Sequence, residues 1–429
     1  MKISLSTKSQ SGSVLVVCLV ISGLLGLTLL TVLNMVSSER TIIARTEAWN
    51  SAIPISEAGV EDAMAHLNYH GTTDLASDGW TLSNNKYTRQ NTFGDGYYVA
   101  SISTSSPPII VSQGFIHAPA QTTYINRQVQ VKTRRNGRFP KAVLTKGPIT
   151  TTGHAEIASF NSTNALYNTG GKYDPNKKSA NAGVATTSSA PGSINLGGGD
   201  IYGSVGTAPG GSVTPGQGGV GDVAWNTLGN SGIQDGHISA DVSVDIDDAS
   251  LPFSPSDAST PTIGKYLYDS TTYKYSLGNG DYVLPSLKMT SKEGVVITGK
   301  VRLYISGSLD MSGQSTIYLA PGASLELYVG GPTASIEGGG IINASDGASS
   351  LSIFGLPGVT SVTCGGNSGF TGTIYAPEAD VKIDGTADFT GAVVANSFTM
   401  AGTGNMYYDE ALGGPSGYKF VVNSWQEDF

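Results

Sequence analysis

The sequence predicts a mainly β protein with one long N-terminal α-helix, in which a small antiparallel sheet is followed by a right-handed parallel β-helix (solenoid). Three observations carry this prediction. Residues 14–36 are almost wholly apolar, the apolar spacing changes to two in residues 79–138, and apolar pairs recur about every eight residues between Val295 and Met406. Each periodicity is typical of a different kind of element.

The composition favours short strands and excludes one class of partner. Only 13% of the 429 residues are charged and 57 are glycine, whereas ordinary domains have about 25% charged residues. This balance predicts many tight corners. The net charge of -9 argues against a nucleic-acid partner, because phosphate binding needs clustered Lys and Arg.

The apolar run has the length of a membrane helix. Its 23 residues span roughly 35 Å at ~1.5 Å per residue, enough for a hydrocarbon core of about 30 Å. No small-x-small cleavage site follows it, so we expect the helix to be retained. Lys2 and Lys8 precede it without an acidic residue, whereas Glu39 and Arg40 follow it as a mixed pair. The positive-inside bias places the N-terminus in the cytoplasm and the bulk of the chain outside.

The helical pattern continues beyond the membrane segment to position 70. A stripe with coiled-coil spacing consists of Ile42, Trp49, Ile53, Val60, Met64 and Leu67. We expect this stripe to pack on a partner, because such packing supplies most of a helix's stability. Pro54 interrupts the pattern and predicts a kink. His70-Gly71 provides a C-cap.

The apolar spacing of two predicts the small antiparallel sheet in residues 71–138. Strands are expected at residues 97–102, 109–111, 114–116 and 124–131, separated by Gly, Pro and Ser turns.

Recurring apolar doublets predict the solenoid in residues 139–415. Four apolar doublets start eight residues apart, at Val301, Leu309, Ile317 and Leu325, and a second series starts at Val381, Phe389, Phe398 and Met406. Three such sides make a rung of roughly 24 residues; an antiparallel sandwich is the competing architecture. The Gly-rich residues 203–222 are expected to form a loop and residues 416–429 a C-terminal tail.

The N-terminal region resembles PilX-type minor pilins of type IV pilus systems. The resemblance rests on a leader (residues 1–12) ending in Gly12, the apolar segment after it, and AWNSAIPISEAGVEDAMAHL from Ala48 to Leu67. It implies cleavage by a prepilin peptidase after Gly12, leaving Ser13 first, and a helix that anchors the protein and packs with other pilin-like subunits. Most major pilins have Glu at the fifth mature position, which is Val17 here.

Two further stretches carry a resemblance. Residues 94–133 are similar to the short sheet that follows this helix in PilX-like proteins, and residues 142–412 are similar to an uncharacterised β-solenoid domain attached to such N-termini. The second similarity lies in GTIYAP at 372–377, GAVV at 391–394 and YDEAL at 408–412, where relatives often have His in place of Tyr407. No activity is established for that domain.

Carboxylates offer the main alternative to a structural role. Asp380, Asp384 and Asp388 are four residues apart, and paired carboxylates about 5 to 10 Å apart serve glycoside hydrolysis. Four residues of extended strand span roughly 13 Å, however, so the three need not converge. A membrane-tethered carbohydrate-active β-helix enzyme, a lyase or hydrolase, is therefore the second hypothesis.

Metal and thiol chemistry is weakly indicated, and the sequence predicts no cofactor. Asp241, Asp245, Asp247 and Asp248 could ligate calcium but lack the pattern of an EF-hand, which favours a solvated loop. His66 and His70 have i, i+4 spacing without a third ligand. Cys18 lies in the apolar segment and Cys364 is expected to be a buried small residue.

Together these features predict a non-enzymatic, pilin-like structural protein of the bacterial inner membrane. It would act in type IV pilus or pseudopilus assembly or in surface presentation at the pilus or cell surface. Its solenoid would contact a partner, a glycan or another surface ligand.

Overall fold

The computed structural model describes residues 11–70, 75–105, 107–118, 123–345, 347–366, 369–413 and 419–428. The chain forms two compact units. The helix–sheet unit comprises Met1–Arg135 and Lys419–Phe429, and the parallel-sheet unit comprises Asn136–Tyr418. The parallel-sheet unit is therefore an insertion in the chain of the helix–sheet unit.

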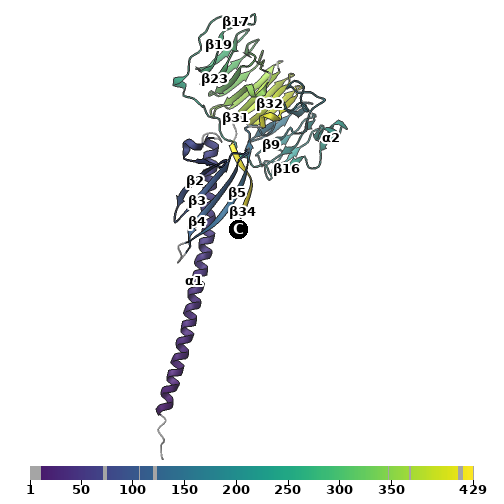
Figure 1. Ribbon diagram of the computed structural model, residues 1–429. Helices are drawn as coiled ribbons and strands as arrows, with labels where there is room; N and C mark the ends of the chain where they lie inside the picture. Colours follow the sequence, from purple (N-terminus) through teal and green to yellow (C-terminus); the bar gives the residue numbers. More distant parts are fainter. Residues whose placement is uncertain are drawn as a thin grey trace, which may run out of the picture. The chain divides into compact units, whose positions relative to one another are not determined.

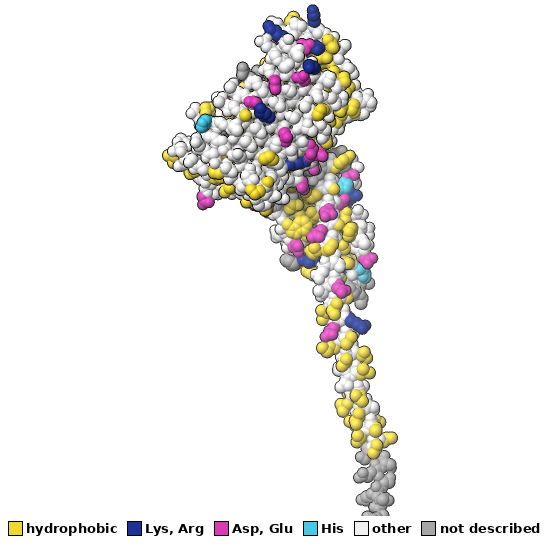
Figure 2. Space-filling model, turned by 180° about the vertical axis from the view of Figure 1, so that it is seen from behind, with side chains coloured by type: hydrophobic (Ala, Val, Ile, Leu, Met, Phe, Trp, Pro, Cys, Tyr) yellow, Lys and Arg dark blue, Asp and Glu magenta, His cyan; other side chains and the backbone are white. Residues whose placement is uncertain are grey.

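One long helix, α1 (Ser11–His70), confirms the predicted N-terminal helix. It is unbroken through Pro54. Its apolar residues 14–36 are all exposed, and the hydrophobic side chains along this part of the helix are visible in Figure 2. Buried positions begin at Ala48, so the two ends of one helix have different surroundings.

The small sheet lies beside the second half of α1 (Figure 1). Strands β1 to β5 pair with antiparallel neighbours in chain order. A 3-10 turn, η1 (Leu75–Asp78), precedes them. Their bounds are β1 (Thr81–Ser83), β2 (Lys86–Phe93), β3 (Gly96–Ser103), β4 (Ile109–His117) and β5 (Tyr124–Asn136). The strands expected at 109–111 and 114–116 are one strand, β4, because Gly114 continues the extended backbone instead of turning it.

The expected C-terminal tail is a strand. Residues Lys419–Asp428 form β34, which pairs beside β5 as the last strand of a six-stranded sheet. Pairing with β5 gives the backbone of β34 hydrogen-bond partners within the protein, where a solvated tail would bond to water. The end of the chain thus returns to the unit in which it began.

Small residues form the face of α1 that packs on the sheet. The fully buried positions include Ala52, Ser56 and Ala63, whereas Ile42 and Trp49 of the predicted stripe are 61% and 38% exposed. The stripe is therefore wrong at its N-terminal end, although Val60 and Leu67 are buried as expected. The packed face consists of small residues because the backbones of the helix and the sheet approach closely there.

Two glycines make this approach possible. A Cβ on Gly59 would lie 2.2 Å from Ser112 Oγ, and a Cβ on Gly114 would lie 2.4 Å from Ala52 O. Neither distance is compatible with a side chain. Large apolar residues at this seam would hold the helix away from the sheet.

Ser56 joins α1 to two strands at the same seam. Its Oγ accepts a hydrogen bond from the Gly114 backbone N–H at 3.1 Å and lies 2.9 Å from Ala52 O and 3.0 Å from Arg127 O. Ser56 and Gly59 both belong to the Ser-Glu-Ala-Gly element that carries the N-terminal resemblance. Tertiary contact explains why small residues occupy those positions.

The parallel-sheet unit is built from three parallel ladders, and neighbouring strands in each come from successive passes of the chain. The first ladder runs β20 (Gly280–Leu284), β23 (Lys300–Ile305), β26 (Ser324–Val329), β29 (Leu351–Gly355), β31 (Phe370–Gly385), β32 (Phe389–Gly402), β6 (Val143–Thr145), β9 (Val184–Thr186), β12 (Val205–Gly206) and β16 (Ile238–Ser239). The second runs β21 (Leu287–Met289), β24 (Leu309–Met311), β27 (Thr333–Ile336), β30 (Ser361–Gly366), β31, β32, β7 (Ile149–Thr151), β10 (Ile194–Asn195) and β13 (Val213–Thr214).

The third ladder has two parts. One is the sheet of β19 (Tyr275–Leu277), β22 (Gly294–Ile297), β25 (Thr316–Leu319) and β28 (Ile341–Asn343). The other runs β31, β32, β33 (Met406–Asp409), β8 (Ile157–Phe160), β11 (Ile201–Tyr202), β14 (Gly219–Gly221) and β15 (Gly232–Ile233). Outside the ladders lie the hairpin β17 (Tyr266–Tyr268) and β18 (Thr271–Tyr273), helix α2 (Val223–Thr227), and the 3-10 turns η2 (Pro255–Asp257), η3 (Ala348–Ser350) and η4 (Glu410–Gly413).

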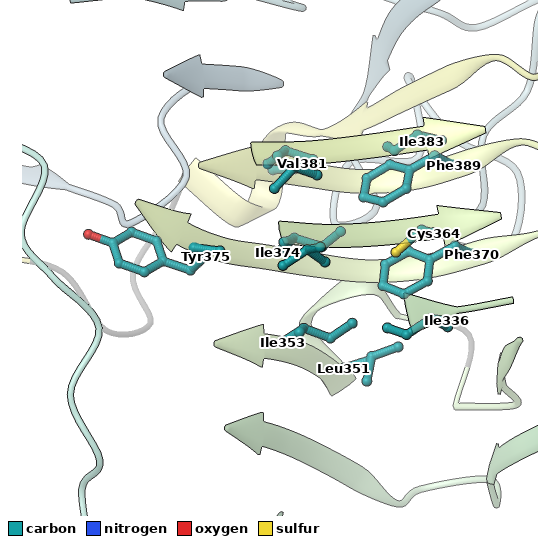
Figure 3. Close-up of a cluster of buried hydrophobic side chains, with 14 of the residues drawn as sticks. Ile336, Leu351, Ile353, Cys364, Phe370, Ile374, Tyr375, Val381, Ile383 and Phe389 are labelled. Atoms are coloured by element: carbon teal, nitrogen blue, oxygen red, sulfur yellow. The ribbon is translucent and has the colours of Figure 1, made fainter. Parts of the chain in front are cut away.

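The apolar doublets fill the interior between the ladders. Val301 pairs with Leu325 and Leu303 with Leu327, so the first and fourth doublets are stacked neighbours in one ladder, 24 positions apart as expected. In the second series Val381 pairs with Phe398 and Phe389 with Met406, at 17 positions. Figure 3 shows this interior near Phe370 and Phe389, whose rings stack at 4.9 Å.

The Gly-rich segment 203–222 contains strands, which corrects the expectation of a loop. It contributes β12, β13 and β14, whose partners are short strands of neighbouring passes. Backbone pairing holds these strands, and glycine permits close approach of neighbouring passes: a Cβ on Gly218, directly before β14, would lie 2.1 Å from Gly199 O. A sequence search for apolar doublets misses strands of this kind.

The order of strands in space differs from their order in the chain. The last strands pair with the first, since β32 lies beside β6 and β7, and β33 lies beside β8. From this centre the chain builds β6 to β16 toward one end of the stack. It must then reach β19 at the other end before returning to the centre through β31.

A strap, residues 240–265, makes that crossing over the first ladder. Tyr375 of β31 donates a hydrogen bond to Asp247 O at 2.6 Å, Phe253 lies 6.2 Å from the ring of Tyr328 in β26, and Ser259 bridges to Tyr282 in β20. The contacts thus advance along the ladder with the sequence of the strap. The entry and exit of the unit meet at the centre, where Tyr408 Oη donates to Phe139 O at 2.8 Å.

We expect Ser56→Ala to destabilise the helix–sheet unit by about 1–3 kcal/mol, because it leaves the buried Gly114 N–H without its acceptor. Ser51→Ala is the matched control: Ser51 makes the same kind of i−4 bond to Glu47 O at 2.8 Å but is exposed. Hydrogen exchange of the full-length protein in nanodiscs should show faster exchange of β4 in the first variant alone. Equal exchange in the two variants would contradict the role given to Ser56.

We expect Cys364 to resist alkylation in the folded protein. It is 6% exposed, as predicted for a buried residue, and burial raises the pKa of its thiol to about 12. In a Cys18→Ala background at pH 8, N-ethylmaleimide should react at least about a hundredfold more slowly than after denaturation, because only the thiolate reacts. Mass spectrometry would measure both rates, and similar rates would show that the site opens readily.

Candidate functional site

The exposed apolar segment of α1 is the first candidate site. Sixteen large apolar side chains between Val14 and Val36 are exposed, each of which would gain about 1.5–3 kcal/mol on burial. Within the described residues, α1 is the one helix long and apolar enough to cross a membrane. Gly12 and Ser13 lie in its first turn, and their side chains are outside the described part of the structure.

A polar cluster closes the far end of α1. His66 Nε2 lies 3.0 Å from Asp62 Oδ1 and its Nδ1 contacts Asp78, while Arg89 lies 2.8 Å from His66 Nε2. Tyr98 donates a hydrogen bond to Asp62 at 2.8 Å, and burial together with that carboxylate raises the pKa of Tyr98. His66 therefore ties α1 to η1 and β2. The side chain of His70 is outside the described residues.

The second candidate site is an open groove on the parallel-sheet unit, with a volume of about 420 Å³. Its floor is a row of outward-facing side chains from three neighbouring strands. Thr371 pairs with Thr390, and Thr390 with Tyr407. All three are half-buried, while their chain neighbours Phe370, Phe389 and Met406 point into the core.

At the Tyr407 end of this row a tyrosine pair forms a wall of the groove. Tyr173 comes from the long loop between β8 and β9 and stacks on Tyr407, with ring centroids 3.7 Å apart and planes 13° apart. Tyr173 donates a hydrogen bond to Glu156 Oε1 at 2.8 Å. Burial, followed by the bond to Glu156, raises the pKa of Tyr173. Burial and the charge of Asp388 raise the pKa of Tyr407 to about 12, so both phenols are neutral at physiological pH.

Three carboxylates line the groove, and they differ in exposure and in hydrogen-bond partners. Glu156 accepts from Lys178 at 3.2 Å as well as from Tyr173. Asp409 is buried, and its Oδ1 accepts from the backbone N–H groups of Ser162 and Ala411. Asp388 is exposed, and its Oδ1 accepts from the Asn405 backbone and side chain at 2.9 and 3.1 Å. Asp388 is thus the accessible and oriented carboxylate.

The structure separates the carboxylates proposed for catalysis. Asp380 accepts hydrogen bonds from Asn396 and Ser397, and Asp384 forms an ion pair with Lys382 at 2.6 Å. Asp388 alone of the three lines the open groove. Asp384 and Asp388 share only a recess of about 30 Å³, which is too small for a sugar ring.

The acidic segment 241–248 lies in the strap and has structural partners. Asp248 lies 3.6 Å from Lys146, which also contacts Glu378, and the Asp247 carbonyl receives the bond from Tyr375. Across the described residues there is no group of three or more His, Cys, Asp or Glu side chains placed to hold a metal ion.

Sequence reasoning found part of this groove. Asp388 and Tyr407 were both noted, the first as a carboxylate and the second as a departure from similar domains. Tyr173 and Glu156 were missed, because they precede Tyr407 by more than 230 positions and meet it only through the pairing of β33 with β8. No local signal marks them.

One family model matches part of the chain. Residues 226–414, less than half of the chain, match the model of a domain of unknown function (DUF7305). That segment includes Asp388 and Tyr407 but neither Glu156 nor Tyr173. None of the curated proteins matches the sequence.

Among solved structures, the chain is similar to the competence-associated pilin ComZ from Thermus thermophilus. The two are 13% identical, with 89% of this chain and 97% of that chain covered and a TM-score of 0.26. At this TM-score the similarity does not establish a shared fold.

Proposed function

We propose that this chain is a pilin-like structural protein, anchored by α1 in the bacterial inner membrane with its N-terminus in the cytoplasm. The observation that carries the proposal is the division of α1. Its residues 14–36 are exposed and almost wholly apolar, and the same helix then packs through Ala52, Ser56 and Gly59 onto a sheet. Burying sixteen large side chains in lipid or against other helices would gain on the order of tens of kcal/mol.

The unit that follows would be an interaction module. We propose that its three ladders wind as a right-handed β-solenoid, since crossover connections between parallel strands are right-handed in about 98% of cases. Outside the membrane this module would meet a surface ligand. Other pilin-like subunits would pack against the apolar part of α1, and the N-terminal leader would be the substrate of a prepilin peptidase.

The absence of glutamate at the fifth mature position limits the kind of subunit. Val17 is exposed and apolar, so it can pack in lipid or among helices but cannot pair with a neighbour's N-terminal amine. This supports a role in initiating or capping an assembly, or in the membrane itself, rather than as the repeating subunit of a filament. The alternative of a carbohydrate-active enzyme has weaker support, because Asp380, Asp384 and Asp388 have separate partners.

We expect the native protein to begin at Ser13, and Gly12→Asp to retain residues 1–12, because a charged side chain at the cleavage position blocks entry to the peptidase site. Ser6→Asp is the matched control: it adds the same charge but keeps Gly12, and should be processed normally. Intact mass and N-terminal sequencing would be compared in cells with and without the prepilin peptidase. A native protein beginning at Met1, or unchanged processing of Gly12→Asp, would overturn the proposal.

A further inference from the structure

We propose that the groove between Tyr173, Tyr407 and Asp388 binds a neutral, hydroxyl-rich glycan. The inference deepens the proposed function, since it rests on the parallel-sheet unit being an interaction module presented outside the membrane. It gives that module a ligand class and a location.

The floor of the groove suits a chain of hydroxyl groups. Thr371 and Thr390 present hydroxyls from neighbouring parallel strands, which are about 4.8 Å apart. A hydroxyl both donates and accepts, so this row can match a ligand with many hydroxyls in either role. The groove is open, which permits a polymer to enter from the side.

The wall supplies flat apolar surface and fixed polar atoms. The stacked rings of Tyr173 and Tyr407 are held by the pairing of β33 and by the bond to Glu156, so little ordering is needed on binding. A sugar ring presents C–H groups on its faces, which pack on aromatic rings, and hydroxyls at its edge. Asp388, oriented by Asn405, can accept from two adjacent hydroxyls.

The charge of the groove argues against anionic ligands. Its lining includes Glu156, Asp388 and Asp409 against the single lysine Lys172. Lys178 pairs with Glu156 from outside the lining, which still leaves the carboxylates in excess. A phosphate or an acidic polysaccharide would face this negative charge. A cationic peptide is the other class that an acidic groove admits, but it would not use the row of threonine hydroxyls or the aromatic wall.

The test is calorimetric titration of the full-length protein in nanodiscs with cellohexaose, maltohexaose and chitohexaose as neutral probes. Hexagalacturonate and hexalysine serve as the anionic and cationic probes. We expect saturable binding of at least one neutral hexasaccharide, stronger than binding of either charged probe. Preference for a charged probe, or no binding of the neutral ones, would overturn the inference.

Variants locate the binding. Tyr407→Ala and Asp388→Asn should each weaken it about tenfold, the loss expected for an aromatic contact or a charged hydrogen bond. Tyr407→Phe keeps the stacked ring and should bind within about threefold of the native protein, which separates ligand contact from failure to fold. Tyr167→Ala, an exposed tyrosine in the same loop that does not line the groove, should leave binding unchanged.

Binding that is unaffected by Tyr407→Ala and Asp388→Asn would place the ligand elsewhere and reject this site. The glycan-binding result does not depend on whether the leader is cleaved after Gly12. A protein that begins at Ser13 but binds no glycan would overturn this inference alone, and one that binds glycan but is not processed would overturn the pilin-like role alone.

Discussion

The pairing of the last strands of the parallel-sheet unit with its first strands is the constraint on which the rest of the molecule depends. Because β32 and β33 lie beside β6, β7 and β8, the chain enters and leaves the stack at its centre. An insertion between β5 and β34 needs this arrangement, since a stack built in sequence order would separate its two ends. The strap over the first ladder is the structural consequence.

The same pairing creates the groove. Tyr407 belongs to the last strand and Tyr173 to the loop that follows one of the first, so their stacking depends on the closure at the centre of the stack. Thr371 and Thr390 extend the floor into the neighbouring passes. A surface of this kind is a property of stacked strands, because each pass adds one outward side chain at the same place.

In the helix–sheet unit, the close approach of α1 and the sheet is the main constraint on the structure. Gly59, Gly114 and the hydroxyl of Ser56 allow the two backbones to meet and satisfy a buried N–H group. This fixes where the packed half of α1 begins and leaves the apolar half exposed. One helix is therefore exposed and apolar at one end and part of a folded domain at the other.

The sequence by itself determined the long helix, its apolar segment, the antiparallel sheet and the 24-residue spacing between β23 and β26, because each is a local periodicity of apolar side chains. It also named Asp388, together with Asp380 and Asp384, as a candidate carboxylate. Only the tertiary structure decided which face of α1 packs, that β34 completes the sheet, that the Gly-rich segment 203–222 pairs as strands, and that Tyr173 meets Tyr407. These features depend on backbone pairing and close approach between residues far apart in the chain, and such contacts leave no periodic pattern in the side chains.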